Sequence, residues 1–252
     1  MRPFRRAYAA FNRRVLRRRL PSYAIARPLV AGKRGLEVGG PSDFFARHGE
    51  FPVYAEAASI DNCNYAAQTA WAGAAPAGQN FVYDARRPPG RQYIAEAARL
   101  TEIPSGSYDF ILASHTLEHL ANPLAALREW LRVLGSGGGL VIVVPDRGGT
   151  FDHRRPVTTL AHLEDDFARR TGEDDLTHLD EILTLHDLAR DPQAGDAAAF
   201  RTRSLDNVSN RCLHHHVFDR DLLAAALGHA GADVLTLDWA APYHIIAVAR
   251  TP

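Results

Sequence analysis

The stretch from Lys33 to Ser42 constrains this chain most, because a short apolar run there breaks into Gly39-Gly40-Pro41. Residues 35–38 fit a buried strand, and two glycines just past a strand let the backbone approach a ligand with no Cβ in the way. Glu37 lies near the expected strand end, where ligands bind in open α/β sheets. A purely structural turn is the alternative interpretation of the glycine pair.

A second acid follows at a spacing typical of nucleoside sites. Ser59-Ile60-Asp61 comes about twenty residues after the glycine turn and fits a strand end closed by a carboxylate. A carboxylate at that place suits the ribose hydroxyls of a nucleoside held at the first turn. Strand, glycine turn and Asp61 together therefore predict nucleoside binding.

Apolar runs of strand length alternate with helical patterns along most of the chain. Strands are expected at 35–38, 51–60, 81–83, 108–113 and 140–144, and helices at 93–100, after Asn122 and at 219–230. Continuously apolar strands that alternate with helices predict a parallel sheet covered on both faces. The runs at 233–238 and 243–249 lie so close together that an antiparallel hairpin at a sheet edge is expected.

Two segments lie outside this alternation. Residues 1–32 are expected to form a basic helical extension, with an apolar stripe over 4–20 that Pro21 ends. That helix could pack on the domain, lie on an anionic membrane surface or bind a phosphorylated substrate. The rest, residues 33–252, forms one domain with a polar, histidine-rich insertion at about 147–212, which is expected to be a helical lid.

The composition narrows the possible partners and the compartment. The chain has 252 residues, 46% of them hydrophobic, and a formal net charge of zero, which gives no electrostatic case for binding nucleic acid. Two cysteines in a chain of this length argue against a disulfide framework and favour the cytoplasm. Lys33 is the only lysine among 29 basic residues, a bias that favours a GC-rich bacterial source.

Two longer motifs give the chain a family resemblance. Residues 108–120 read YDFILASHTLEHL, and residues 132–146 read RVLGSGGGLVIVVPD. Over roughly residues 33–250 the chain resembles the class I S-adenosylmethionine-dependent methyltransferases. Around 146–162 and 216–219 it is similar to a bacterial subgroup that acts on small metabolites and glycans. The resemblance implies a Rossmann-like, doubly wound, seven-stranded and mostly parallel sheet with an antiparallel C-terminal edge strand, and S-adenosylmethionine as the cofactor.

The resemblance also implies a set of cofactor contacts at the strand ends. Glu37, Gly39 and Gly40 would line the methionine end, Asp61 would bind the ribose hydroxyls, and Asn62 would lie beside the adenine. Asp84 and Ala85 would contact the adenine edge, and Ser114 and His115 would lie beside the sulfonium. A histidine next to that cation should be neutral.

A hydroxyl acceptor must lose its proton, and histidine suits that task. Candidate catalytic residues are His119, which follows the fourth strand, His153 in the insertion, and His215 within His214-His215-His216. Arg154 and Arg155 could clamp an anionic acceptor. His214 and His216 could bind a metal with Asp146 or His153, but a wall of the active site is favoured and no metal is expected.

The sequence therefore predicts a cytoplasmic O-methyltransferase that acts on a small metabolite or glycan. Two alternatives stay open. One is a nicotinamide-dependent oxidoreductase, which the absence of G-x-G-x-x-G disfavours. The other is a non-catalytic Rossmann-fold protein that serves binding or assembly.

Overall fold

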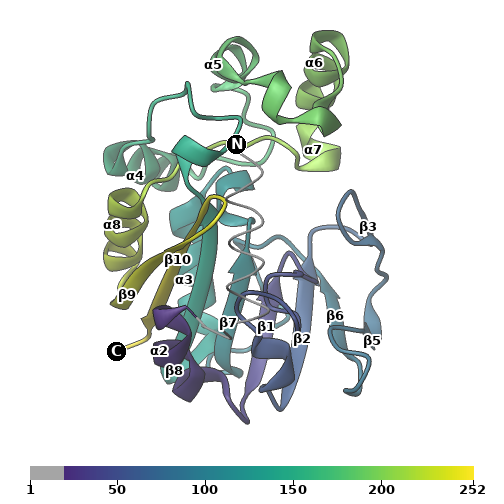
Figure 1. Ribbon diagram of the computed structural model, residues 1–252, viewed down its shortest axis with the longest axis vertical. Helices are drawn as coiled ribbons and strands as arrows, with labels where there is room; N and C mark the ends of the chain where they lie inside the picture. Colours follow the sequence, from purple (N-terminus) through teal and green to yellow (C-terminus); the bar gives the residue numbers. More distant parts are fainter. Residues whose placement is uncertain (1–19) are drawn as a thin grey trace.

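The structure is a computed structural model that describes residues 20–252 (Figure 1). The basic helix expected from residue 4 lies outside the described residues, and so do its expected membrane or substrate contacts. Pro21 begins a helix, α2 (Pro21–Val30), since a proline at the first helical position loses no hydrogen bond. Tyr23, Ala26 and Val30 of α2 are buried, so this segment packs on the domain.

One large sheet organises the molecule. Its strands are β1 (Arg34–Val38), β2 (Ser59–Asn64), β5 (Gly78–Phe81), β6 (Gly90–Ile94), β7 (Tyr108–Ser114), β8 (Leu134–Pro145), β9 (Asp233–Ala240) and β10 (His244–Arg250). They lie in the order β5-β6-β2-β1-β7-β8-β10-β9. The five strands from β6 to β8 are parallel, and β10 runs antiparallel to β8 and to β9. The Rossmann-like sheet and its C-terminal hairpin are thus confirmed.

The β5–β6 edge differs from the expectation. The described residues form an eight-stranded sheet, because β5 joins it as a short antiparallel edge strand beside β6. The strand expected at 81–83 is β5, which ends at Phe81 and so lies a few residues earlier. No helix forms at 93–100: β6 ends at Ile94, and residues 95–100 form turns and irregular chain. Gly90 opens β6 because any Cβ there would overlap the backbone of Ile60 in β2. The buried Gln92 gives this strand a polar inner face, which hides it from a search for apolar runs.

Apolar side chains cover both faces of the sheet. Alternate residues of the central strands point to opposite faces, as Ile111 and Leu112 of β7 do. One face packs against α3 (Pro123–Val133), α4 (Leu160–Arg169) and α8 (Arg220–Ala230). The other packs against α2 and the aromatic loop that contains η1 (Val53–Ala55). This two-sided burial explains why the strands read as continuous apolar runs.

Local signals set the helix ends as the sequence predicts. The Asn122 side chain accepts a hydrogen bond from the backbone of Ala125, 3.0 Å away, and Pro123 begins α3. Asp219 caps α8 in the same way, and Gly231 ends it with φ of 102°.

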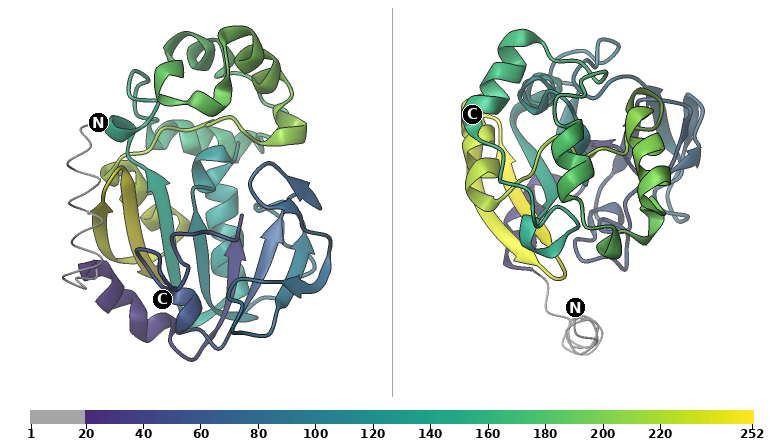
Figure 2. Two further views of the ribbon diagram at one scale, coloured as in Figure 1. Left: turned by 45° about the vertical axis from the view of Figure 1, so that its right-hand side comes forward. Right: turned by 90° about the horizontal axis from the view of Figure 1, so that it is seen from above.

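The insertion lies over the carboxyl ends of the parallel strands, at the top of Figure 1 and in the left view of Figure 2. Its elements after β8 are η3 (Arg147–Gly149), α4, α5 (Leu179–Leu185), η4 (Leu188–Arg190), η5 (Pro192–Ala194), α6 (Ala197–Leu205) and α7 (Asn207–Asn210). Ile182 of α5, Phe200 of α6 and Leu213 pack together in a small hydrophobic core within the insertion. In the part of the chain that is described, no helix combines the length and apolarity needed to cross a membrane.

Candidate functional site

A pocket of about 390 Å³ opens at the carboxyl ends of β1, β2, β6 and β7, beneath the insertion. Its walls come from every one of these strand ends. The lining residues are Val38, Gly39, Pro41, Ser42, Asp43, Cys63, Asn64, Tyr65, Trp71, Ala95, Glu96, Ala97, Ser114, His115, Thr116, His119, Leu120, Glu173 and Arg211. This is the edge of an open α/β sheet at which ligands bind. We call it the main pocket.

The glycine turn forms the floor of the main pocket. Gly39 has φ of 83°, and a Cβ there would overlap the Thr116 hydroxyl, so only glycine fits. The Asn62 side chain accepts from the Gly40 amide at 3.0 Å and donates to the Gly40 carbonyl at 3.2 Å. Gly39 thus lies in the pocket as expected, whereas Asn62 and Gly40 brace the turn from behind.

Asp61 lies outside the main pocket, contrary to the expectation that it closes a strand. β2 continues to Asn64, so Asp61 is in mid-strand. Its carboxylate accepts from Arg34 at 2.9 Å, from the Tyr108 hydroxyl at 2.8 Å and from the Arg91 amide at 2.8 Å. These bonds tie neighbouring strands together and occupy three of the roughly four acceptor positions of the carboxylate.

Asn64 occupies the strand end that was assigned to Asp61. Its amide nitrogen donates to the Gly40 carbonyl at 3.1 Å. Its side-chain oxygen, Oδ1, is buried and has no hydrogen-bond partner among the described residues. Asn64 also lines the main pocket. A buried acceptor without a partner is costly, so this atom marks a place for a ligand donor. The signal in the sequence was the apolar Cys63 after Asn62, which shows that the strand continues.

Glu37 points away from the main pocket. It is fully buried behind the glycine turn, where it accepts a 2.6 Å hydrogen bond from the Tyr54 hydroxyl. Burial raises the pKa of this carboxyl to about 8, an effect that the Tyr54 hydrogen bond reduces. Glu37 is therefore largely protonated at neutral pH and holds the aromatic loop against β1, although the resemblance assigns it to the cofactor.

Asp84 and Ala85 also lie away from the main pocket. Both follow the edge strand β5, and Asp84 pairs with Arg47 at 2.6 Å. Backbone hydrogen bonding to Arg86, with help from Arg47, lowers the pKa of Asp84. The acid that reaches the pocket from this side is Glu96, two residues beyond β6. Glu96 was not among the expected site residues, because residues 93–100 were expected to form a helix.

Ser114 and His115 lie at the end of β7, as expected, and they also line a second, more open hollow. We call this hollow the side pocket; its lining residues are Ser42, Asp43, Phe44, Ala46, His48, Gly49, Glu50, Ser114, His115, Tyr243 and His244. His115 Nδ1 lies 3.3 Å from the Glu118 carboxylate, and His115 Nε2 lies 2.8 Å from His244 Nδ1. His115 has φ of 52°, so backbone strain is accepted to place its ring between the two pockets.

His119 lines the main pocket from the short η2 helix (Leu117–His119). Its Nδ1 lies 2.9 Å from the Leu213 carbonyl, an acceptor, so Nδ1 carries the hydrogen and Nε2 is the bare nitrogen. Burial lowers the pKa of His119 to about 4, and nearby His214 adds to this effect. His119 is therefore neutral at physiological pH.

The other histidines expected to be catalytic lie elsewhere. His153 pairs with Asp187 at 2.9 Å within the insertion. His215 is buried and bonds Asn207 at 3.0 Å. Neither belongs to the lining of the main pocket or of the side pocket among the described residues. The structure thus brings His119 to the pocket but separates it from His153 and His215.

The two arginines expected to clamp an acceptor have structural partners instead. Arg155 is 1% exposed and bonds Asp152 at 3.0 Å and Glu181 at 2.8 Å. Arg154 lies 3.4 Å from Asp187. Burial and these bonds exclude Arg155 from an anion clamp, whereas Arg154 is half-exposed and stays a candidate contact for an anion. A buried, fully bonded guanidinium cannot be told from an exposed one by its place in a sequence.

Arg211, which the sequence analysis did not single out, closes the main pocket from the insertion. It forms a 2.7 Å ion pair with Glu96 and a 3.0 Å ion pair with Glu173. Its guanidinium lies over the Tyr65 ring, and the Tyr65 hydroxyl donates to the Ser209 carbonyl at 2.7 Å. These contacts join the insertion to the ends of β2 and β6, as a lid over the pocket requires.

The main pocket fits S-adenosylmethionine in shape and chemistry. Its volume lies in the range of small-molecule sites, about 300–1,000 Å³. The glycine floor and the unpartnered Asn64 oxygen suit a nucleoside with hydroxyl and amino donors, and Glu96, which is paired with Arg211, adds a carboxylate to the same wall. The neutral His119 leaves no uncompensated imidazolium beside a bound cation.

Comparison with known proteins agrees with this site. A family model described as a methyltransferase domain matches residues 6–237. The chain belongs to this methyltransferase family, and its cofactor is S-adenosylmethionine. The match identifies an enzyme and excludes the nicotinamide-dependent and non-catalytic alternatives. It does not extend to the glycan and small-metabolite subgroup. No curated protein matches the chain.

Solved structures show the same fold at low sequence identity. An S-adenosylmethionine-dependent methyltransferase from Mesorhizobium loti is 13% identical with a TM-score of 0.51, covering 91% of this chain and 96% of its own. A putative methyltransferase from Bacillus halodurans is 11% identical with a TM-score of 0.50, covering 92% and 97%. A Haloferax volcanii putative methyltransferase, solved with the Trm112 methyltransferase activator, is 13% identical with a TM-score of 0.51, covering 98% and 96%.

Proposed function

We propose that this methyltransferase methylates a hydroxyl oxygen of a small, hydroxylated acceptor of the metabolite or sugar class. The acceptor would bind in the side pocket, next to a cofactor held in the main pocket. The observation that carries the proposal is the position of His115, which lines both pockets and joins Glu118 on one ring nitrogen to His244 on the other.

The lining of the side pocket supports an acceptor of this kind. Aromatic rings of Phe44, Tyr243 and His244 pack around it, and the Phe44 and His244 rings are 5.1 Å apart. His48 and Glu50 add polar groups at its edge. Apolar and aromatic walls with a few polar groups are typical of small-molecule sites.

Cofactor contacts are assigned from the main pocket. We assign the ribose hydroxyls to the side-chain oxygen of Asn64 and to Glu96, which follows the neighbouring strand β6. Gly39 lets the backbone approach the cofactor, and His119 keeps the neighbouring wall uncharged. When bound, S-adenosylmethionine supplies an electrophilic methyl group on a positively charged sulfur.

The His115–His244 pair receives the proton that the acceptor hydroxyl loses as its oxygen bonds the methyl carbon. Glu118 is fully buried, and His115 lowers the pKa of this carboxyl although burial opposes it, so it stays ionised. An ionised Glu118 keeps the hydrogen of His115 on Nδ1 and leaves Nε2 on the side of His244. The other product, S-adenosylhomocysteine, forms when the carbon–sulfur bond breaks.

The test is a methyl-transfer assay with labelled S-adenosylmethionine against matched panels of hydroxylated metabolites, sugars and amines. The labelled atom is then located by mass spectrometry. H115A should lower kcat about 10²–10⁴-fold while the affinity for S-adenosylhomocysteine is kept. H229Q is the control, because His229 pairs with Glu164 on the far helical layer. Transfer only to amines, or full activity in H115A, contradicts the proposal.

A further inference from the structure

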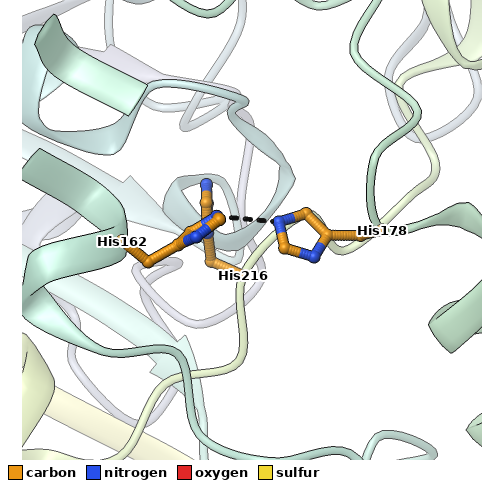
Figure 3. Close-up of side chains that lie close together, drawn as sticks. All are labelled: His162, His178 and His216. Carbon is orange, nitrogen blue, oxygen red and sulfur yellow. Dashed lines mark hydrogen bonds between the residues drawn. The ribbon is translucent and has the colours of Figure 1, made fainter. Parts of the chain in front are cut away.

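Three histidines and an aspartate meet away from both pockets. His162 and Asp166 lie one turn apart on α4, His178 precedes α5, and His216 comes from the segment before α8. Figure 3 shows the three imidazole rings turned toward one another from separate parts of the chain. We call these four residues the histidine cluster. His216 was expected to act with His214 and with Asp146 or His153, whereas its neighbours here are His162, His178 and Asp166.

The ligand atoms of His162, His178 and His216 all lie within 4.8 Å of one another, and Asp166 lies beside two of these histidines. His162 Nε2 lies 2.9 Å from His178 Nε2 and 3.2 Å from Asp166 Oδ2, and His216 Nε2 lies 3.7 Å from the same oxygen. Bonds of about 2.0–2.2 Å at tetrahedral angles put the ligand atoms of a zinc ion roughly 3.3–3.5 Å apart. The three distances fall on both sides of this range, so the imidazoles must turn to centre an ion, with the Asp166 carboxylate as the fourth ligand.

Two buried atoms of the cluster have no hydrogen-bond partner among the described residues. They are Asp166 Oδ2 and His216 Nδ1, and His216 is only 1% exposed. Buried polar atoms without a partner are rare and costly. A metal ion bound at Asp166 Oδ2 would give this oxygen the partner that it lacks. The other oxygen, Oδ1, accepts from the Thr171 hydroxyl at 3.0 Å, the outer support that ligating carboxylates usually have.

We propose that the histidine cluster binds one divalent first-row transition-metal ion, Zn²⁺ in the first place. Three imidazoles and one carboxylate in a tetrahedral arrangement are a donor set that Zn²⁺ favours. All four positions would be filled by protein, so the site is structural. His162 is about one-third exposed and provides the path of entry.

The ion would fasten the insertion to residues 118–122, which lie beside the main pocket. The backbone amide of His216 donates to the Glu118 carbonyl at 3.3 Å, and Asn122 donates to the Asp166 carbonyl at 2.9 Å. Residues 118–122 carry His119 and Leu120 of the main pocket. Fixing α4, His178 and His216 to one ion therefore fixes the wall of the pocket and one end of the lid.

A second group, Glu118 with His119 and His214, also brings three possible ligands within 4.8 Å. His119 and His214 hold Nδ1 against the Leu213 carbonyl and Asp152, which leaves Nε2 of each for an ion. The histidine cluster has a carboxylate, Asp166, beside its three imidazoles as a fourth ligand, so we propose the site there, and the second group becomes a separate outcome of the test.

The test uses full-length protein prepared without a polyhistidine tag and stripped with a chelator. Zn²⁺ is titrated against a fluorescent competitor, and Co²⁺ is titrated by visible absorption, in which tetrahedral coordination gives intense bands. Wild type should bind one ion per chain with Kd below about 1 μM and show the tetrahedral spectrum. H178Q and H162Q should each bind at least about tenfold more weakly.

Controls separate this site from other histidines and from misfolding. H229Q should bind like wild type, and binding of S-adenosylhomocysteine shows that each variant is folded. Weak binding or an octahedral cobalt spectrum in wild type overturns the proposal without any variant. Unchanged affinity in H178Q and H162Q, or loss in H214Q alone, overturns it as well.

Discussion

Arg211 of the insertion donates two hydrogen bonds, of 2.7 and 3.3 Å, to the carboxylate of Glu96 beyond β6. The same guanidinium pairs with Glu173, for which burial raises the carboxyl pKa against the effect of Arg211. Arg211 is thus the charge that lets two acids lie together at the rim of the main pocket. It also links the lid to the segment that follows β6.

We expect R211A to release the lid without unfolding the domain. Removing the cation leaves Glu96 and Glu173 facing each other, so residues 205–213 should exchange amide hydrogen at least about tenfold faster. Hydrogen exchange with mass spectrometry measures this. R203A is the matched control, since Arg203 pairs with Asp191 at 3.2 Å wholly within the insertion. Equal exchange of residues 205–213 in R211A and wild type would show that Arg211 is not the latch.

We expect Asn64, and not Asp61, to bind the ribose hydroxyls of the cofactor. Calorimetry with S-adenosylhomocysteine tests this. N64A removes the pocket-facing carbonyl oxygen and should weaken binding about tenfold, the loss typical of one buried hydrogen bond. D61N keeps the shape but weakens the bonds to Arg34 and Tyr108, so it should lower stability and leave affinity within about threefold. The reverse ranking of the two affinities would restore Asp61 as the ribose ligand.

Glu37 should make stability depend on pH in a direction opposite to a paired carboxylate. Its folded pKa, about 8, lies above the ordinary value of 4.5, so its contribution is fully present below pH 4.5. That contribution is lost as pH rises from 4.5 toward 8, because over this range the unfolded chain releases the Glu37 proton while the folded protein still holds it.

E37Q keeps the neutral shape of the protonated acid and does not titrate. It should match wild type near pH 4.5 and exceed it at pH 7.5 by up to about 3 kcal/mol, with less if water reaches the site. Urea unfolding of both proteins from pH 4.5 to 8 measures the gap. A gap that stays constant over this range would mean that Glu37 is ionised in the folded state.

Local sequence patterns determined most of the fold. Continuous apolar runs such as 140–144 predict buried parallel strands, and Asn122-Pro123 and Gly231 mark helix ends, because these signals act between neighbouring residues. The motifs at 108–120 and 132–146 identified the family. The glycine turn placed the pocket correctly, since only glycine tolerates the backbone of Gly39.

The tertiary structure decided which polar side chains reach the pocket. A one-residue change in where a strand ends turns a side chain to the opposite face, and β2 extends three residues past Asp61, so Asn64 takes its place. β6 has a polar inner face, so Glu96 was hidden in an expected helix. Arg211, Asp166 and the histidines of the cluster come together from segments distant in sequence, and only the packing of the insertion on the sheet brings them into contact.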